Sequence, residues 1–253
     1  MSDSSKHSLA EATRSRASFS DHANSLGAAG FVSPHDESQP ADFLSQPGQT
    51  AIVNPTREGI KDFEIGVAWD NIKQRVPLGK QTFLEKLLHI KPKTKKKKRN
   101  VDLDIGCLYE LKNGKRGAIQ AFGEMFGEYD NEPYIALNRD ERTGDSDGED
   151  ELIRVNGKRW DRFERILIYI YIYKGAENWD MVQPQVQVRV PEEKPMIVNL
   201  HAKKQELALC AVAQLENIRG GIKMTNIMEY FPGHAEMDRS FGYGLQWEEG
   251  QKR

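Results

Sequence analysis

The stretch ILIYIYIY, Ile166–Tyr173, decides the fold class of this 253-residue chain. Successive side chains of a β-strand point to opposite faces, so the isoleucines at even positions share one face and Leu167 shares the other with three tyrosines. Both faces are apolar enough to need cover, because an exposed strand of this composition would aggregate. The stretch therefore predicts a central strand of a two-layer sandwich.

Short apolar runs separated by polar turns continue on both sides of this stretch from about residue 60, which is typical of an all-β domain. Asn113-Gly114 is a strong hairpin signal between two such runs. Thr82–His89 is expected to form a short helix, and too little helix remains for parallel βαβ units. The predicted fold is a two-layer antiparallel β-sandwich with strands at Phe63–Trp69, Asp102–Leu111, Gly117–Phe122, Tyr134–Leu137, Leu152–Val155, Arg165–Tyr173, Val186–Val190, Met196–Leu200, Leu207–Glu216 and Ile222–Tyr230.

Residues 1–57 differ in composition from the rest of the chain. They are rich in Ser, Ala, Asp and Pro and poor in large apolar residues, and the mean hydropathy of the whole chain is −0.68. Such a segment buries too little apolar surface to offset the entropy of ordering it. We expect a disordered N-terminal arm over residues 1–57 and one β-sandwich domain over 58–253, with a basic insert near residues 78–100.

The cysteines and the apolar runs indicate a cellular compartment. Cys107 and Cys210 each lie inside an apolar stretch, and neither has a second Cys or His at metal-ligand spacing. No apolar run approaches the roughly 20 residues that a transmembrane helix needs. No hydrophobic signal region is present at the N-terminus. These features lead us to expect a cytoplasmic protein.

An acidic stretch, NRDERTGDSDGEDE, interrupts the strand pattern at residues 138–151. Seven of the twelve residues from Asp140 to Glu151 are carboxylates, and Gly144 and Gly148 let the backbone bend so that oxygens can converge. So many like charges repel each other unless water, salt or a cation relieves them. Oxygen ligands on an irregular loop suit Ca²⁺, whereas the lack of nearby His or Cys argues against zinc and copper. The stretch does not fit an EF-hand, because Asp145 replaces the glycine required at the sixth position.

A second acidic element, Asp102 and Asp104 in VDLDIG, strengthens the metal interpretation. The two carboxylates alternate at a strand start and therefore share one face. A cation that bridges this pair to the acidic loop explains both elements, although a solvated loop without a ligand is the alternative. The predicted metal ligands are Asp102, Asp104, Asp140, Asp145, Asp147, Asp150 and Glu151.

The two acidic motifs together resemble the tellurium-resistance TerD/TerA family. VDLDIGCLYELKNG followed by RDERTGDSDGEDELIRV is similar to the family's strand start and acidic loop, and the C-terminal YFPGHAEMDRSFGYGLQW is closer to the TerA branch. Glu141 and Ser146 depart from the family's usual Asn and Gly. The resemblance implies a calcium-binding β-sandwich in a tellurite or general stress response, without catalytic residues. It also implies other tellurium-resistance proteins as partners and a sensing or scaffolding role near the inner face of the membrane.

A basic run, KPKTKKKKR from Lys91 to Arg99, directly precedes the first acidic motif. A solvated loop that balances the acidic site is one interpretation, and attraction to anionic lipid head groups is another. Nucleic acid is less favoured, because no aromatic residues interleave with the lysines to stack bases. The run therefore predicts association with an anionic membrane surface as an alternative function.

An enzyme is the other alternative. The same carboxylates with Mg²⁺ or Mn²⁺ would suit phosphoryl chemistry, but the chain has no glycine-rich phosphate loop and no histidine pair or Ser or Cys nucleophile motif. Trp160 and Trp179, near loop ends, are expected to pack at the rim. The favoured interpretation is a non-enzymatic, cytoplasmic, calcium-binding stress module.

Overall fold

The computed structural model describes residues 40–69, 72–77, 94–99, 101–138, 151–176, 179, 182–200 and 207–247. By its contacts the chain divides into Met1–Val32 and Ser33–Arg253, and every described residue belongs to the second unit. The expected helix at Thr82–His89 and the acidic residues 139–150 lie outside the described residues. For β4, β5 and Glu151 only the backbone is described.

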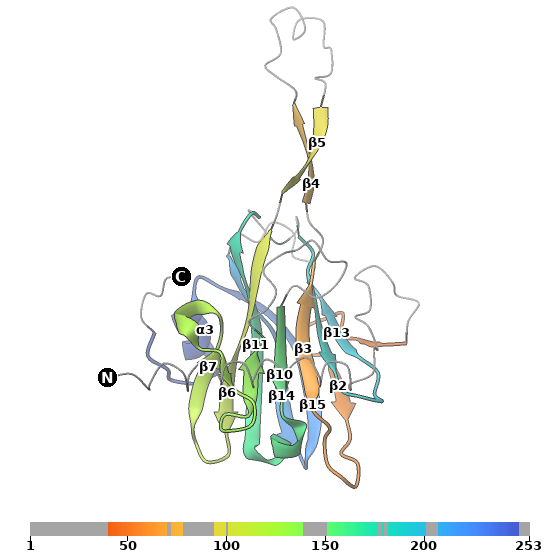
Figure 1. Ribbon diagram of the computed structural model, residues 1–253, viewed down its shortest axis with the longest axis vertical. Helices are drawn as coiled ribbons and strands as arrows, with labels where there is room; N and C mark the ends of the chain where they lie inside the picture. Colours follow the sequence, from red (N-terminus) through yellow and green to blue (C-terminus); the bar gives the residue numbers. More distant parts are fainter. Residues whose placement is uncertain are drawn as a thin grey trace, which may run out of the picture. The chain divides into compact units, whose positions relative to one another are not determined.

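Two large sheets face each other (Figure 1), which confirms the predicted sandwich. The first has the order β1-β13-β12-β3-β10-β9-β8, and the second β2-β15-β14-β11-β6-β7. The first sheet is built from β1 (Asp42–Phe43), β3 (Phe63–Ala68), β8 (Gly127–Glu128), β9 (Ile135–Leu137), β10 (Glu151–Val155), β12 (Gln185–Arg189) and β13 (Met196–Asn199). The second is built from β2 (Thr50–Val53), β6 (Asp102–Leu111), β7 (Arg116–Ile119), β11 (Phe163–Lys174), β14 (Leu209–Ile218) and β15 (Gly221–Phe231).

Strand β11 contains the stretch that decided the fold class, and it lies between β6 and β14 as a central strand should. Ile166, Ile168 and Ile170 are fully buried in the core between the sheets. Leu167 and Tyr169 on the opposite face are buried in a second apolar cluster, outside the sandwich core. Both faces of the strand are therefore covered, as its composition predicts.

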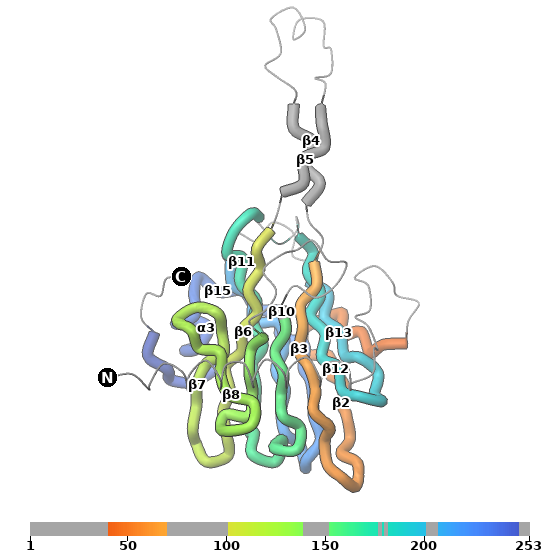
Figure 2. Tube along the Cα trace, viewed as in Figure 1, coloured from red at the N-terminus to blue at the C-terminus, as the bar shows by residue number. Residues whose placement is uncertain are grey.

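The N-terminal boundary of the sandwich needs correction. Strands β1 and β2 lie before residue 58, inside the segment where a disordered arm was expected. Strand β1 pairs in parallel with β13, and β2 pairs antiparallel with β15. Figure 2 shows that the coloured chain begins before β2, and in Figure 1 the labels of β2 and β15 stand side by side. Leu44 and Val53 are buried in the core, so the chain from residue 42 contributes to the domain.

Three local features also differ from expectation. Strand β7 ends at Ile119 and is followed by a 3₁₀ turn, Phe122–Glu124, where a continuous strand to Phe122 was predicted. The basic run does not form a simple loop, because Thr94–Arg99 is strand β5 and pairs with β4 (Ile72–Pro77) in a separate two-stranded sheet. A helix, α3 (His234–Phe241), follows β15 where no helix was predicted.

The Asn113-Gly114 hairpin is confirmed. Gly114 has a φ of +86° and its N–H donates to Leu111 O, which closes the turn between β6 and β7. None of the helices among the described residues combines the length and the apolar character that spanning a membrane requires.

Candidate metal centre

Four strand ends meet at the end of the sandwich where β6 begins. Strand β10 is antiparallel to β3 with Glu151 opposite Val67, and Asn138 N–H, just after β9, donates to Leu152 O. The indole N–H of Trp69, just after β3, donates to Val101 O over 3.2 Å. Both ends of the acidic loop and the first residues of β6 therefore lie at the same end of the fold.

Asp102 and Asp104 share one face of β6, as the two-residue period predicts. Their neighbours Leu103 and Ile105 point into the core between the sheets, so the two aspartates lie on the outer face of the second sheet. Asp102 is half-buried and lies opposite Lys174 of β11, whereas Asp104 is only 3% exposed and lies opposite Tyr171. An acidic pair at a strand start is thus present, with one of its carboxylates almost completely buried.

The remaining predicted ligands divide into two groups. Asp140, Asp145, Asp147 and Asp150 lie outside the described residues. Glu151 is the first residue of β10, and only its backbone is described. Within the described ranges, no three Asp, Glu, His or Cys side chains come together as a metal-binding group. The complete ligand set thus stays a prediction. The structure gives the positions of Asp102, Asp104 and the two ends of the acidic loop.

The residues present fit a hard cation by their chemistry. A buried carboxylate is costly unless its charge is compensated, and two aspartates on one face bring oxygen donors to the end where the acidic loop begins and ends. Neither cysteine is available as a soft ligand, because Cys107 and Cys210 are fully buried and burial raises the pKa of both thiols. Oxygen ligation therefore suits this end of the fold better than thiolate ligation.

Sequence reasoning missed His234, whose imidazole interacts electrostatically with Asp104. His234, the first residue of α3, is surrounded by aromatic rings of Phe122, Tyr169, Tyr171 and Trp247. Burial lowers the pKa of this imidazole, and the charge of Asp104 acts on it in the opposite direction. His234 follows Asp104 by 130 positions, and no local motif signals an electrostatic interaction between the two.

Comparison with known proteins supports the resemblance found in the sequence. The chain is 40% identical over 153 residues to the tellurium resistance protein TerA of an Alcaligenes species. The match covers 60% of this chain and 44% of that relative, so it spans less than half of the relative's length. No protein-family model matches the chain. The match confirms the resemblance to the tellurium-resistance TerD/TerA family.

Proposed function

We propose that this chain, a relative of the tellurium-resistance proteins, is a non-enzymatic calcium-binding module that acts in a cytoplasmic stress response. One observation carries the calcium proposal: Asp102 and Asp104 lie at the end of the sandwich where the acidic loop leaves β9 and enters β10. The proposed ligands are Asp102, Asp104, Asp140, Asp145, Asp147, Asp150 and Glu151. The role in stress rests on the name of the relative and on the resemblance of the acidic motifs.

A calcium titration followed by calorimetry tests this site. Loss of even an outer-shell partner weakens a metal site by roughly 10–100-fold, so we expect Asp104→Asn combined with Asp147→Asn to weaken calcium binding by at least about 100-fold. EDTA should lower the melting temperature of the wild-type protein, because it would leave the clustered carboxylates without a counter-charge.

A matched control removes two acidic charges elsewhere. Asp161→Asn combined with Glu164→Gln changes exposed residues near the start of β11, at the opposite end of the strand from Lys174 and its partner Asp102. This variant should keep the wild-type calcium affinity. Equal affinities of all three proteins, or a melting temperature that EDTA does not change, would contradict the calcium proposal. Preference for Mg²⁺ with turnover of a phosphate ester would instead favour the enzyme.

A second function, contact with an anionic membrane surface, is favoured by the register of β4 and β5. Lys73 lies opposite Lys98, and Arg75 lies opposite Lys96. Like charges directly opposite each other destabilise a strand pair, so an anionic surface would stabilise this ribbon. We infer that the ribbon contacts anionic lipid head groups, where each basic residue contributes about 1 kcal/mol.

Vesicle sedimentation tests the membrane contact. Changing Lys96, Lys97 and Lys98 to Gln should weaken binding to vesicles that contain phosphatidylserine by about 100-fold, because each lysine contributes about 1 kcal/mol. The control changes the exposed Lys112, Lys158 and Lys194 to Gln, which removes the same charge from the sandwich. Equal loss in both variants, or equal binding of the wild type to neutral vesicles, would argue against a specific ribbon contact.

A further inference from the structure

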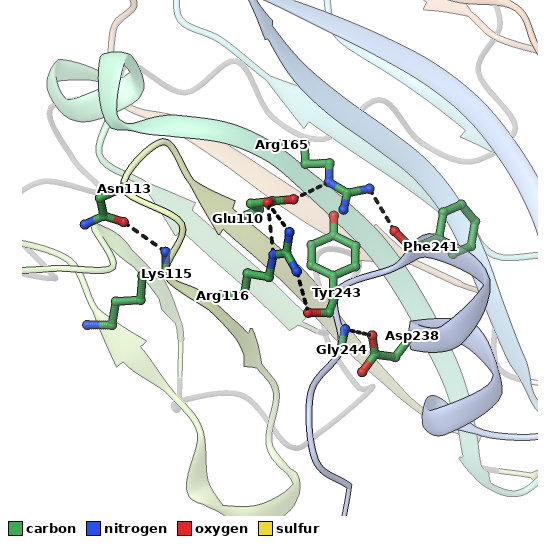
Figure 3. Close-up of polar contacts among 9 residues, drawn as sticks. All are labelled: Glu110, Asn113, Lys115, Arg116, Arg165, Asp238, Phe241, Tyr243 and Gly244. Atoms are coloured by element: carbon green, nitrogen blue, oxygen red, sulfur yellow. Dashed lines mark hydrogen bonds and ion pairs between the residues drawn. The ribbon is translucent and has the colours of Figure 1, made fainter.

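The outer face of the second sheet is covered by residues 233–247, which comprise α3 and the turn after it and which we call the C-terminal strap. Met237 and Tyr243 of the strap are at most 1% exposed and belong to one apolar cluster with Leu108 and Leu167 of the sheet. Arg165 donates to Phe241 O at 2.9 Å and Arg116 donates to Tyr243 O at 3.2 Å, as Figure 3 shows. The strap is thus attached to the sheet by apolar packing and by two arginines.

Asp238 organises the second half of the strap. This carboxylate is 2% exposed and accepts hydrogen bonds from the N–H groups of Gly244 and Leu245, both at 2.7 Å. It also accepts the indole N–H of Trp247 at 2.8 Å. These three bonds turn the chain back after α3 and fix the position of the Trp247 ring.

The fixed Trp247 ring connects Asp238 to the candidate metal centre. It stacks on His234 with ring centroids 5.1 Å apart and an interplanar angle of 25°. The other side of His234 meets Tyr169 and Tyr171 of β11, and Tyr171 lies directly opposite Asp104 in the strand pair. The strap therefore lies over the part of the sheet that contains the buried Asp104 carboxylate.

Burial of Asp104 under the strap has an electrostatic consequence. A carboxylate is costly to remove from water, and a bound cation lowers that cost by compensating the charge. A docked strap excludes water from the face that it covers, and a less polar surrounding strengthens the attraction of a carboxylate for a cation. Each event thus favours the other, and the coupling is reciprocal by thermodynamic necessity.

We propose that docking of the C-terminal strap and calcium binding at Asp104 are positively coupled, so that calcium closes the strap and the closed strap tightens the calcium site. This inference rests on the calcium function proposed above and adds its regulation. The strap is the proposed conformational output of the site, because His234 of the strap packs on Tyr171, the residue directly opposite Asp104. A partner that binds the strap would sense calcium occupancy through this coupling.

Limited proteolysis with trypsin measures strap docking in the full chain. Arg239 is an exposed residue of α3, and Arg219 is an exposed residue between β14 and β15. Calcium should slow cleavage after Arg239 by about tenfold, within the roughly 5–150-fold range of typical allosteric couplings. Cleavage after Arg219 should change much less. Asp104→Asn should abolish the calcium effect at Arg239.

The reciprocal measurement is calorimetry on strap variants. Asp238→Ala removes three hydrogen bonds of the strap and should weaken calcium binding by about tenfold. Trp247→Phe keeps a ring against His234 but loses the bond to Asp238, and serves as a milder variant should Asp238→Ala fail to fold. Ser240→Ala, at an exposed position of α3, is the matched control and should change neither affinity nor cleavage.

Three results would overturn the coupling while leaving the calcium function intact. The first is calcium binding in calorimetry while calcium does not slow cleavage after Arg239. The second is equal slowing of cleavage after Arg239 and after Arg219. The third is wild-type calcium affinity in every strap variant that folds. Tighter calcium binding by Asp238→Ala would reverse the sign and likewise overturn it. Absence of calcium binding by the wild type in calorimetry would instead refute the proposed function, and the coupling with it.

Discussion

Replacement of Trp160 by alanine should lower the free energy of unfolding by about 3–5 kcal/mol, the usual cost of removing a large buried aromatic side chain. Trp160 is 1% exposed and lies in the 3₁₀ turn Gly157–Arg162 before β11. Its ring stacks on Phe163 at 5.4 Å and meets the edge of Phe63 at 5.6 Å. Because Phe63 belongs to the first sheet and Phe163 to the second, the indole fills space between the two layers.

One hydrogen bond adds to this cost. The indole N–H donates to Gly221 O at 3.0 Å, whereas the bond from Asn217 Nδ2 to the backbone oxygen of residue 160 can persist in the variant. The alanine variant creates a cavity and also leaves Gly221 O without its indole donor. Urea unfolding at pH 7 measures the change. Trp160→Phe should cost distinctly less, since it keeps most of the ring packing, and equal costs of the two substitutions would contradict this account.

Replacement of Glu110 by alanine should cost about 2–3 kcal/mol, which is below the full cost of breaking a buried ion pair because Arg116 is 39% exposed. The Glu110 carboxylate accepts hydrogen bonds from Arg116 at 2.6 Å and from Arg165 at 2.7 Å (Figure 3). Its side chain is 14% exposed. Without it, two guanidinium groups face each other beneath the strap with no counter-charge.

The same carboxylate makes stability depend on pH. Burial raises the pKa of Glu110, but the hydrogen bonds from Arg116 and Arg165 outweigh burial and lower the pKa below its ordinary value. A carboxyl group with a lower pKa in the folded than in the unfolded chain stabilises fully above the unfolded pKa. Its contribution is lost as the pH falls through the folded pKa. Acidification should therefore destabilise the wild type more than Glu110→Gln.

Urea unfolding at pH 7 and at acidic pH measures both effects. Glu164→Gln is the matched control, because Glu164 is exposed on β11 beside Arg165. The control should follow the wild type at both pH values. An identical acid-induced loss in the wild type and in Glu110→Gln would show that another group causes it.

Periodic residues predict their own strands well, because a strand face depends only on local alternation. Strand β11 and the shared face of Asp102 and Asp104 follow from this rule. Strand β2 does not, because Thr50–Val53 is a short run in a polar context and its partner Ile222–Thr225 is about 170 positions away. Pairing over such a distance leaves no signal in either segment.

In the candidate metal centre, too, some features could be predicted from the sequence and others could not. Composition predicts the type of ligand, since clustered carboxylates favour a hard cation. It does not predict burial, because the 3% exposure of Asp104 depends on the surrounding fold. Trp160 and Trp179 were expected at the rim, yet both are buried, because the ends of this sandwich are closed by indole rings that donate to backbone oxygens of neighbouring segments.

The pairing of β1 with β13, β2 with β15 and β3 with β12 has a consequence for biosynthesis. Strand β3 can pair with β10 once residue 155 has been translated, but it gains β12 only after residue 185. Strands β1 and β2 find their partners only after residues 196–225 have been translated. Until then their backbone edges and apolar faces are open, so a nascent chain of this protein depends on chaperones or on rapid completion of synthesis to avoid aggregation. Residues 233–247 follow every strand of the second sheet in the sequence, so the outer face that carries Asp104 is covered only after all of these strands have been translated.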